Sequence, residues 1–381
     1  MKRRELLKSA ALLSAGGLLL AKANAAEQCD RNGAAPQSPP GAVTTLAIIS
    51  DMHINSGQLL SEFTSALKNI RTTHNISNVI IPGDVGETAS DIAGALNSVN
   101  AIFTPQESNA IVILGNHDVR GADSSKWTKD PQAENPYFRT IMAQYKQQNS
   151  RVAYGEGHAC FDLRIDSHHF IALNTDRGLK DQAYFDPPTL EWFANKMAEE
   201  TAGRKIVIVH QPLNDTHWRS NLFDGFGQQD AQVKAILAQY PQTFVISGHI
   251  HNGFGVLEVM QKTFGTLLEI PSFNRTENGL MEKGYGFIMH IYEDRFVFEA
   301  WNFLKNLHYP EFDMTVPFAT VANILSESES GCEGPATADI YPWDRISRQV
   351  ESANSIVAGP DKFGVRKIWP TWRWERYGEK L

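Results

Sequence analysis

The stretch ILGNHDVRG, Ile113–Gly121, joins an apolar run to three polar side chains that can bind a metal ion or carry a proton. Its first residues continue the run Ile111–Leu114, which is typical of a buried β-strand. A turn after that strand would account for the glycine and the asparagine. It does not account for His117 and Asp118. The meaning of these two residues therefore depends on whether other strands of the chain end in the same way.

Short apolar runs alternate along the chain with segments whose apolar residues recur at helical spacing. The strand-like runs are 45–50, 78–82, 111–114, 205–209 and 243–246. The helix-like segments are 59–70, 92–103, 190–197 and 233–240. This alternation predicts an α/β domain. Antiparallel hairpins are expected to turn at Asp166-Ser167 and at Glu293-Asp294, with mainly β structure beyond Gly255.

All five strand-like runs end in residues that can bind metal ions. The endings are Asp51-Met52-His53, Gly83-Asp84, Gly115-Asn116-His117-Asp118, His210-Gln211-Pro212 and Gly248-His249-Ile250-His251. Taken singly, each is weak evidence, because a Gly-Asp pair usually marks a turn and an isolated histidine is usually structural. Five in series are hard to attribute to composition in a chain with 12 histidines. Ligands of open α/β sheets gather at the carboxyl ends of strands, so these residues are expected to converge.

The combined set is larger than one catalytic zinc ion requires, since such a zinc takes three protein ligands and a water. Two metal ions suit it better. Mixed imidazole and carboxylate ligands favour iron, manganese, zinc or cobalt over magnesium or calcium. Two such cations about 3.5–4 Å apart can bind both oxygens of an in-line displacement at phosphorus, and a water between them becomes hydroxide near neutral pH.

This ordered set of motifs resembles the calcineurin-like metallophosphoesterase superfamily over about Leu46–His251. The resemblance implies a four-layer α-β-β-α sandwich, in which two mixed sheets are flanked by helices. It also implies a binuclear-metal phosphoester hydrolase, either a phosphodiesterase or a phosphomonoesterase, that uses a metal-bridging hydroxide as its nucleophile on a small-molecule substrate.

The resemblance further implies a role for each matching residue. One metal ion would be held by Asp51, His53 and His251, the other by Asn116, His210 and His249, with Asp84 bridging the two. His117 would protonate the leaving oxygen, and Asp118 would orient the imidazole of His117.

Departures from subfamily patterns narrow the expectation. Ser/Thr protein phosphatases of this superfamily carry Gly-Asp-x-x-Asp-Arg-Gly and end the third motif in Glu, whereas here Asp84 is followed by Val-Gly-Glu and the motif ends in Asp118. Purple acid phosphatases have a tyrosine ligand where this chain has Glu87, so no iron–tyrosinate colour is expected. Two alternatives stay open: a metal-containing module that binds a phosphorylated ligand without turnover, and another dinuclear hydrolase of the metallo-β-lactamase type, although its His-x-His-x-Asp-His cluster is missing.

The amino-terminal 25 residues read as an export signal, with a basic start, an apolar centre and a small-residue cleavage site at Ala23-Asn24-Ala25. Arg3-Arg4 followed by Glu-Leu-Leu-Lys resembles the twin-arginine signal, which implies export of the folded protein by the twin-arginine machinery to the periplasm or beyond. The predicted organisation is a signal peptide at 1–25, a flexible lead-in at 26–42, a metallophosphoesterase domain at 43–305 and a mainly irregular C-terminal extension at 306–381 that packs on the domain.

Composition is ordinary for a soluble globular protein, with 42% hydrophobic and 20% charged residues. The formal charge of −8 gives no basic footprint, so duplex nucleic acid is not expected as a partner, nor is a membrane anchor. Cys160 is expected to be buried, and a pairing of Cys29 with Cys332 is a hypothesis that free-thiol counting tests. Weaker predictions concern two groups of polar residues: Asn214, Asp215 and His217 lining the substrate pocket, and His168-His169, half exposed, not binding metal.

Overall fold

The computed structural model describes residues 44–257 and 259–318. The predicted signal peptide, the predicted lead-in, Cys29, Cys332 and most of the predicted C-terminal extension lie outside these residues. Cys160 is buried, as predicted. In the described part of the chain, no helix is long and apolar enough to cross a membrane.

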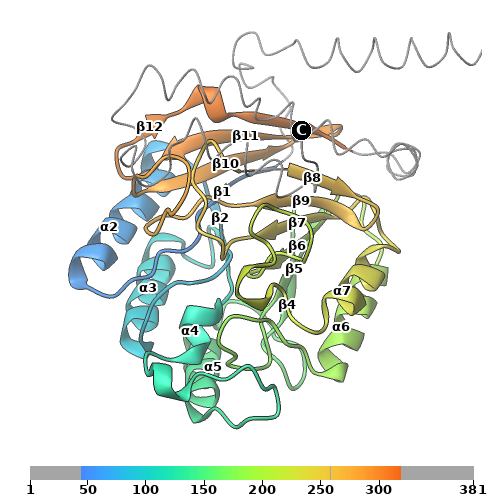
Figure 1. The fold of residues 1–381 in the computed structure, drawn as a ribbon. Helices are drawn as coiled ribbons and strands as arrows, with labels where there is room; N and C mark the ends of the chain where they lie inside the picture. Colours follow the sequence, from blue (N-terminus) through green and yellow to red (C-terminus); the bar gives the residue numbers. More distant parts are fainter. Residues whose placement is uncertain (1–43, 258, 319–381) are drawn as a thin grey trace, which may run out of the picture. The chain divides into compact units, whose positions relative to one another are not determined.

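Two mixed β-sheets form the centre of the fold (Figure 1). The first has the order β12-β11-β10-β1-β2-β3, with β13 also paired to β11. Its strands are β1 (Thr44–Ile48), β2 (Asn78–Ile81), β3 (Asn109–Val112), β10 (Tyr285–Ile291), β11 (Arg295–Asn302), β12 (Leu307–His308) and β13 (Met314–Pro317). The strands β1, β2 and β3 are parallel, whereas β10 pairs antiparallel with both β1 and β11.

The second sheet has the order β4-β5-β6-β7-β9-β8. Its strands are β4 (Phe161–Ile165), β5 (His168–Leu173), β6 (Lys205–Val209), β7 (Phe244–Ser247), β8 (Val259–Lys262) and β9 (Gly265–Glu269). The strands β5, β6, β7 and β9 are parallel, and β4 and β8 are antiparallel to their neighbours. Both predicted hairpins, β4–β5 and β10–β11, are confirmed.

Helices cover the outer face of each sheet, which gives the four layers that the resemblance implies (Figure 1). On the first sheet lie α2 (Gly57–Lys68), α3 (Ala89–Ile102) and α5 (Pro136–Gln148); on the second lie α6 (Pro187–Ala198) and α7 (Asp230–Leu237). Alternate residues of one strand face different layers: Leu46 and Ile48 enter the core between the sheets, while Ala47 contributes to the core under the helices. Burial on both faces is why these strands are continuous apolar runs in the sequence.

Helix α5 was not among the predicted helices, although its start carries a clear signal. Asn135 caps it by accepting a hydrogen bond from the backbone N–H of Phe138 at 3.1 Å, and Pro136 occupies its first position. The buried residues Ile141, Met142 and Tyr145 then recur at helical spacing.

The predicted end of the domain at residue 305 is wrong, because the first sheet continues beyond it. Both β12 and β13 pair antiparallel with β11. Met314 and Val316 alternate with outward-facing residues and join the core between the sheets, together with Phe312. The start of the predicted extension is therefore part of the domain, and the sheet reaches Pro317.

Candidate metal centre

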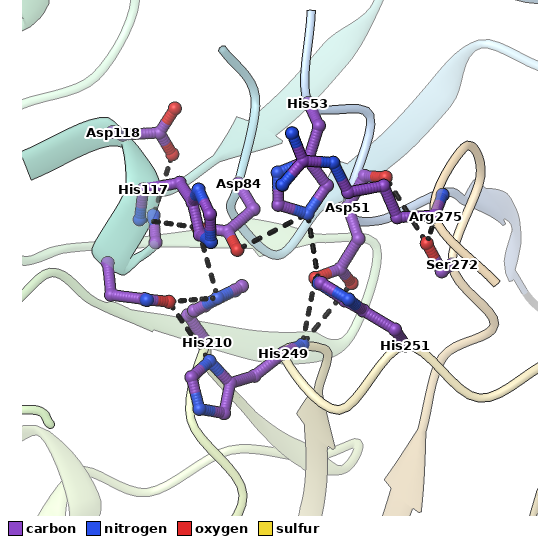
Figure 2. Close-up of polar contacts among 12 residues, drawn as sticks. Asp51, His53, Asp84, His117, Asp118, His210, His249, His251, Ser272 and Arg275 are labelled. Carbon is purple, nitrogen blue, oxygen red and sulfur yellow. Dashed lines mark hydrogen bonds and ion pairs between the residues drawn. The ribbon is translucent and has the colours of Figure 1, made fainter. Parts of the chain in front are cut away.

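The five motifs lie where five parallel strands end, three in the first sheet and two in the second (Figure 2). Strands β1, β2 and β3 lead into Asp51, Asp84 and Asn116, and strands β6 and β7 lead into His210 and His249. The carboxyl ends of these strands converge, as predicted, and they come from both sheets. The side chains form two groups whose ligand atoms all lie within 4.8 Å of one another: Asp51, His53, Asp84 and His251, and Asp84, His210 and His249. Asp84 belongs to both groups.

In the first group, two imidazole nitrogens point at the same position. Nε2 of His53 lies 2.9 Å from Nε2 of His251. The carboxylates of Asp51 and Asp84 stand beside this pair: Oδ1 of Asp51 lies 3.5 Å from His251 Nε2, and Oδ2 of Asp84 lies 3.6 Å from His53 Nε2. Two nitrogens and two carboxylates that converge in this way form a cation site.

In the second group, Oδ1 of Asn116 lies 3.2 Å from Nε2 of His210 and 3.0 Å from Nδ1 of His249. Oδ1 of Asp84 lies 3.2 Å from the same His210 Nε2. The other ring nitrogen of His210, Nδ1, is 2.8 Å from the carbonyl oxygen of Pro82. A hydrogen bond from Nδ1 to that carbonyl turns Nε2 toward the group, which is the arrangement of a metal-binding histidine.

The donor set fits two metal ions. Asp51, His53 and Asp84 have no exposed surface, and one oxygen of Asp84, Oδ2, is buried without a hydrogen-bond partner. A buried carboxylate oxygen without a partner is costly unless a cation satisfies it. Burial lowers the pKa of His53 to about 4, and burial together with the charge of His210 lowers the pKa of His249 to about 3. Both imidazoles are therefore neutral at physiological pH, which is the form that binds metal.

The backbone at these residues is strained. Of the seven predicted ligands, five have a positive φ: Asp51 at 56°, His53 at 47°, Asp84 at 49°, His249 at 78° and His251 at 54°. This left-handed region is unfavourable for residues other than glycine and costs about 1–3 kcal/mol at each position. Strain of this kind persists where the surrounding structure fixes the backbone, and here it directs five side chains to one centre.

Gly115, in the stretch that opens the third motif, is required by space. Its φ of −98° is accessible to any residue. A Cβ at this position, however, would lie 2.6 Å from both the backbone nitrogen of Asp84 and Nε2 of His210. Because Gly115 has no side chain, the chain that follows β3 can pass directly beside Asp84, which belongs to both groups of ligand atoms.

The predicted role of Asp118 needs correction. Its carboxylate does not orient the imidazole of His117, but accepts hydrogen bonds from the backbone N–H groups of Val85, Gly86 and Gly115 at 3.1, 2.8 and 2.7 Å. These donors belong to the turns that follow β2 and β3, where no strand partner satisfies them. Asp118 therefore holds two of the ligand-bearing turns together.

Glu87 takes the position beside His117 that was expected for Asp118. Its Oε2 lies 3.0 Å from Nδ1 of His117, and its Oε1 lies 3.0 Å from Nδ1 of His53 and 2.9 Å from the Arg275 guanidinium. In the sequence, Glu87 stands out only as the residue in the place of a tyrosine ligand of purple acid phosphatases. Its place three residues after Asp84, in the turn that carries the ligand, was the signal for its role.

Two further carboxylates support ligands and carry no local sequence signal. Oδ1 of Asp181 lies 3.3 Å from the side-chain nitrogen of Asn116, which turns the amide oxygen toward the centre. Oε1 of Glu277 lies 3.2 Å from Nδ1 of His251. Both come from segments far from their partners in the sequence.

The weaker predictions have mixed outcomes. Asn214 and Asp215 make hydrogen bonds to Phe226 and Asn221 of the same loop, and Asn214 also bonds α7, so these contacts support the loop and not the ligands. His168 and His169 are buried, not half exposed. His169 pairs with Asp162 at 2.8 Å in a group that includes Lys196, whose ammonium supplies the positive charge there.

Comparison with known proteins agrees with the motifs and the fold. A family model described as calcineurin-like phosphoesterase matches residues 44–253, which is more than half of the chain. No curated protein matches the sequence.

Among solved structures, a dimetal phosphatase from Danio rerio is similar with a TM-score of 0.50 and 12% identity, over 73% of this chain and 100% of that chain. A purple acid phosphatase from yellow lupin (Lupinus luteus) seeds is similar with a TM-score of 0.51 and 12% identity, over 75% of this chain and 55% of that chain. At this identity, both likenesses concern the fold.

Proposed function

The chain belongs to the calcineurin-like phosphoesterase family, and we propose that it is an exported phosphoester hydrolase that works with two transition-metal ions. One observation carries this proposal: the buried carboxylate of Asp84 belongs to both groups of ligand atoms and keeps one oxygen without a hydrogen-bond partner. A carboxylate shared in this way offsets the repulsion between two neighbouring cations, which a site for a single ion would not need.

The ligand assignment follows the two groups. Asp51, His53 and His251 would hold one ion, Asn116, His210 and His249 the other, and Asp84 both. Iron, manganese, zinc and cobalt suit such nitrogen and oxygen donors. When bound, these ions supply Lewis acidity toward the phosphoryl oxygens and lower the pKa of a coordinated water.

His117 is the proposed proton donor to the leaving oxygen. Hydrogen bonding of its Nδ1 to Glu87 at 3.0 Å leaves Nε2 as the atom that exchanges a proton with the substrate. A guanidinium nitrogen of Arg120 lies 2.7 Å from this Nε2.

Metal analysis combined with two model esters tests the hydrolase. The mature protein is purified, its bound metals are quantified, and hydrolysis of p-nitrophenyl phosphate is compared with that of bis-p-nitrophenyl phosphate. We expect about two ions per chain, turnover of at least one ester, and loss of both in Asp84→Asn; the preferred ester then decides between monoesterase and diesterase. No bound metal, and no turnover after reconstitution with manganese, iron, zinc or cobalt, would instead favour a binding module.

Export is proposed from the amino-terminal residues, which resemble a twin-arginine signal. Cell fractionation of a bacterium that expresses the full chain tests it. We expect the processed protein in the periplasm or medium, and its retention inside the cell when Arg3 and Arg4 are both replaced by lysine. Unchanged export of that double variant would assign the signal to the general secretory route.

A further inference from the structure

The loop that follows His210 places an exposed aromatic ring beside the metal centre. Leu222 and Phe223 are 40% and 51% exposed, and with Leu307 they are the exposed large hydrophobic side chains of the described residues. The ring of Phe223 meets the imidazole of His249 edge-on, with ring centroids 6.3 Å apart. One edge of the centre is therefore bordered by an apolar surface that water reaches.

The backbone holds Phe223 in this position against its local preference. Phe223 has a φ of 55°, and Asp224 and Gly225, which follow it, have φ values of 70° and 59°. Phenylalanine rarely adopts this region, and an exposed ring gains nothing from burial that would offset the strain.

Hydrogen bonds within the loop maintain the strained turn. Oδ1 of Asn214 accepts from the backbone N–H of Phe226 at 2.7 Å. Asp215 and Asn221 bond each other twice, at 2.6 and 2.8 Å. The loop is thus built as a fixed support for Phe223.

Ion pairs tie the same loop to its surroundings on two sides. Arg219 pairs with Glu277 at 2.6 Å, and Glu277 in turn contacts the ligand His251. Asp224 pairs with Lys129, from the loop that follows α4 (Asn116–Arg120). The position of Phe223 is therefore coupled to the metal ligands and to the opposite loop.

That opposite loop carries a second aromatic ring. Trp127 is partly exposed, and the guanidinium of Arg120 lies 4.0 Å from its ring centroid. Arg120 contacts His117 on its other side. Aromatic residues thus flank the centre both near the metal ligand His249 and near the proposed proton donor.

Resting on the proposed function, we propose that Phe223 is a specificity-determining residue that receives a planar, apolar organic group of the phosphoester. The substrate class would then be esters with an aromatic or heteroaromatic group, favoured over small alkyl and polyhydroxylated esters. Stacking or edge contact with such a group covers the exposed ring, which supplies the burial that the free loop lacks.

Diesters that share one leaving group test this proposal in the full chain loaded with metal. Phenyl p-nitrophenyl phosphate and methyl p-nitrophenyl phosphate differ only in the group that remains on phosphorus. We expect the wild-type protein to favour the phenyl ester in kcat/KM, and Phe223→Ala to lower that preference by about 3- to 10-fold, mainly through KM. Phe223→Leu, which keeps an apolar side chain without a ring, should lose most of the preference. Leu307→Ala, an exposed apolar control on β12, should leave it unchanged.

A binding measurement separates failure of this inference from failure of the hydrolase. Calorimetric titration compares phenylphosphonate with methylphosphonate, neither of which can be hydrolysed. Tighter binding of phenylphosphonate, abolished in Phe223→Ala, supports the inference even if no ester is turned over, in which case the hydrolase proposal fails alone. Equal binding of the two phosphonates, or a preference that survives in Phe223→Ala, overturns the inference whatever the activity. A dimer that Phe223→Ala dissociates would also overturn it, because the ring would then serve an interface.

Discussion

Oε2 of Glu87 lies 3.0 Å from Nδ1 of His117, and the other oxygen of the same carboxylate lies 3.0 Å from Nδ1 of His53. One side chain thus fixes both a metal ligand and the proposed proton donor. Each imidazole then presents its Nε2 away from Glu87, and for His53 that nitrogen faces Asp84 and His251. The two functions share one support, so a change at Glu87 should disturb both.

Replacing Glu87 with glutamine should lower turnover by about 10- to 100-fold, which is typical when the partner of a ligating histidine is lost. The loss should be greater for alkyl than for p-nitrophenyl esters, because p-nitrophenolate leaves without a proton. His117→Ala should show the same dependence on the leaving group. Steady-state kinetics with the two kinds of ester measure it.

Glu107→Gln is the control for that experiment, since Glu107 is an exposed glutamate that pairs with Arg71 at 3.6 Å, away from the predicted ligands. It should behave as wild type. An equal loss for both kinds of ester in Glu87→Gln would contradict the role of Glu87 in proton transfer and leave it only its support of His53.

Asp181 should control the affinity of the metal ion that Asn116 binds. Its Oδ1 lies 3.3 Å from the amide nitrogen of Asn116 and 2.7 Å from the Arg120 guanidinium. The same amide nitrogen also donates to the Lys180 carbonyl at 3.1 Å, so loss of Asp181 removes one of these two acceptors and holds the amide oxygen less firmly toward the centre. We expect Asp181→Ala to weaken binding of one of two metal ions by about 10- to 100-fold, measured by competition with a chelator.

Asp186→Ala is the matched control, because Asp186 also pairs with an arginine, Arg177, at 2.7 Å. It supports no predicted ligand. Equal metal affinities in the two variants would show that Asp181 serves only the ion pair with Arg120.

The sequence was sufficient to predict the α/β alternation and the five strand ends whose polar residues converge. Strands buried on both faces are continuous apolar runs, and each of the five parallel ones ends in a polar residue that a buried strand does not need. These two signals are local. Neither depends on knowing which of the two sheets a strand joins.

The supporting residues could not be predicted, because tertiary contacts decide them. Asn116 and Asp181 are 65 positions apart, and nothing near Asp181 marks it as a partner. Asp118 adjoins His117 in the sequence, yet three unpaired backbone N–H groups at neighbouring turns attract its carboxylate. The domain end was missed because β13 is a strand of four residues, separated from β11 by the two-residue strand β12 and a short 3₁₀ helix.

Gly115→Ala should damage the centre through space alone. The added methyl group would lie 2.6 Å from the Asp84 backbone nitrogen and from His210 Nε2, so the two strand ends must separate. Overpacking of this kind costs about 1–3 kcal/mol of the free energy of unfolding. We expect a lower melting temperature and loss of bound metal. Gly57→Ala, where a Cβ meets nothing within 4 Å, should keep the wild-type melting temperature and the bound metal. Bound metal retained in Gly115→Ala would mean that the turn after β3 can shift to make room for the methyl group.

Removal of the metal ions should destabilise the protein. The centre gathers buried carboxylates and imidazoles on a strained backbone, and ions that bind only the folded chain stabilise it by about 2.7 kcal/mol at one hundred times their Kd. Treatment with a chelator should therefore lower the melting temperature by roughly 5 °C. Calorimetry measures the shift and its reversal by added manganese or zinc. Asp84→Asn should show no such response, and an identical response in that variant would place the stabilising ions elsewhere.

Glu299, on β11, should make the free energy of unfolding depend on pH in the acid range, because it contacts His290 on the neighbouring strand β10. The contact with the His290 imidazole, whose Nε2 lies 3.3 Å from Oε1 of Glu299, holds the pKa of Glu299 at about 2, below its usual value of 4.5. A depressed carboxyl pKa adds stability that is complete above the unfolded value and is lost as the pH falls from about 4.5 toward 2. Urea unfolding should therefore show wild type more stable than Glu299→Gln at pH 6, with the difference shrinking by pH 3. A difference that stays constant between these two pH values would mean that the ionised form of Glu299 is not what the hairpin stabilises.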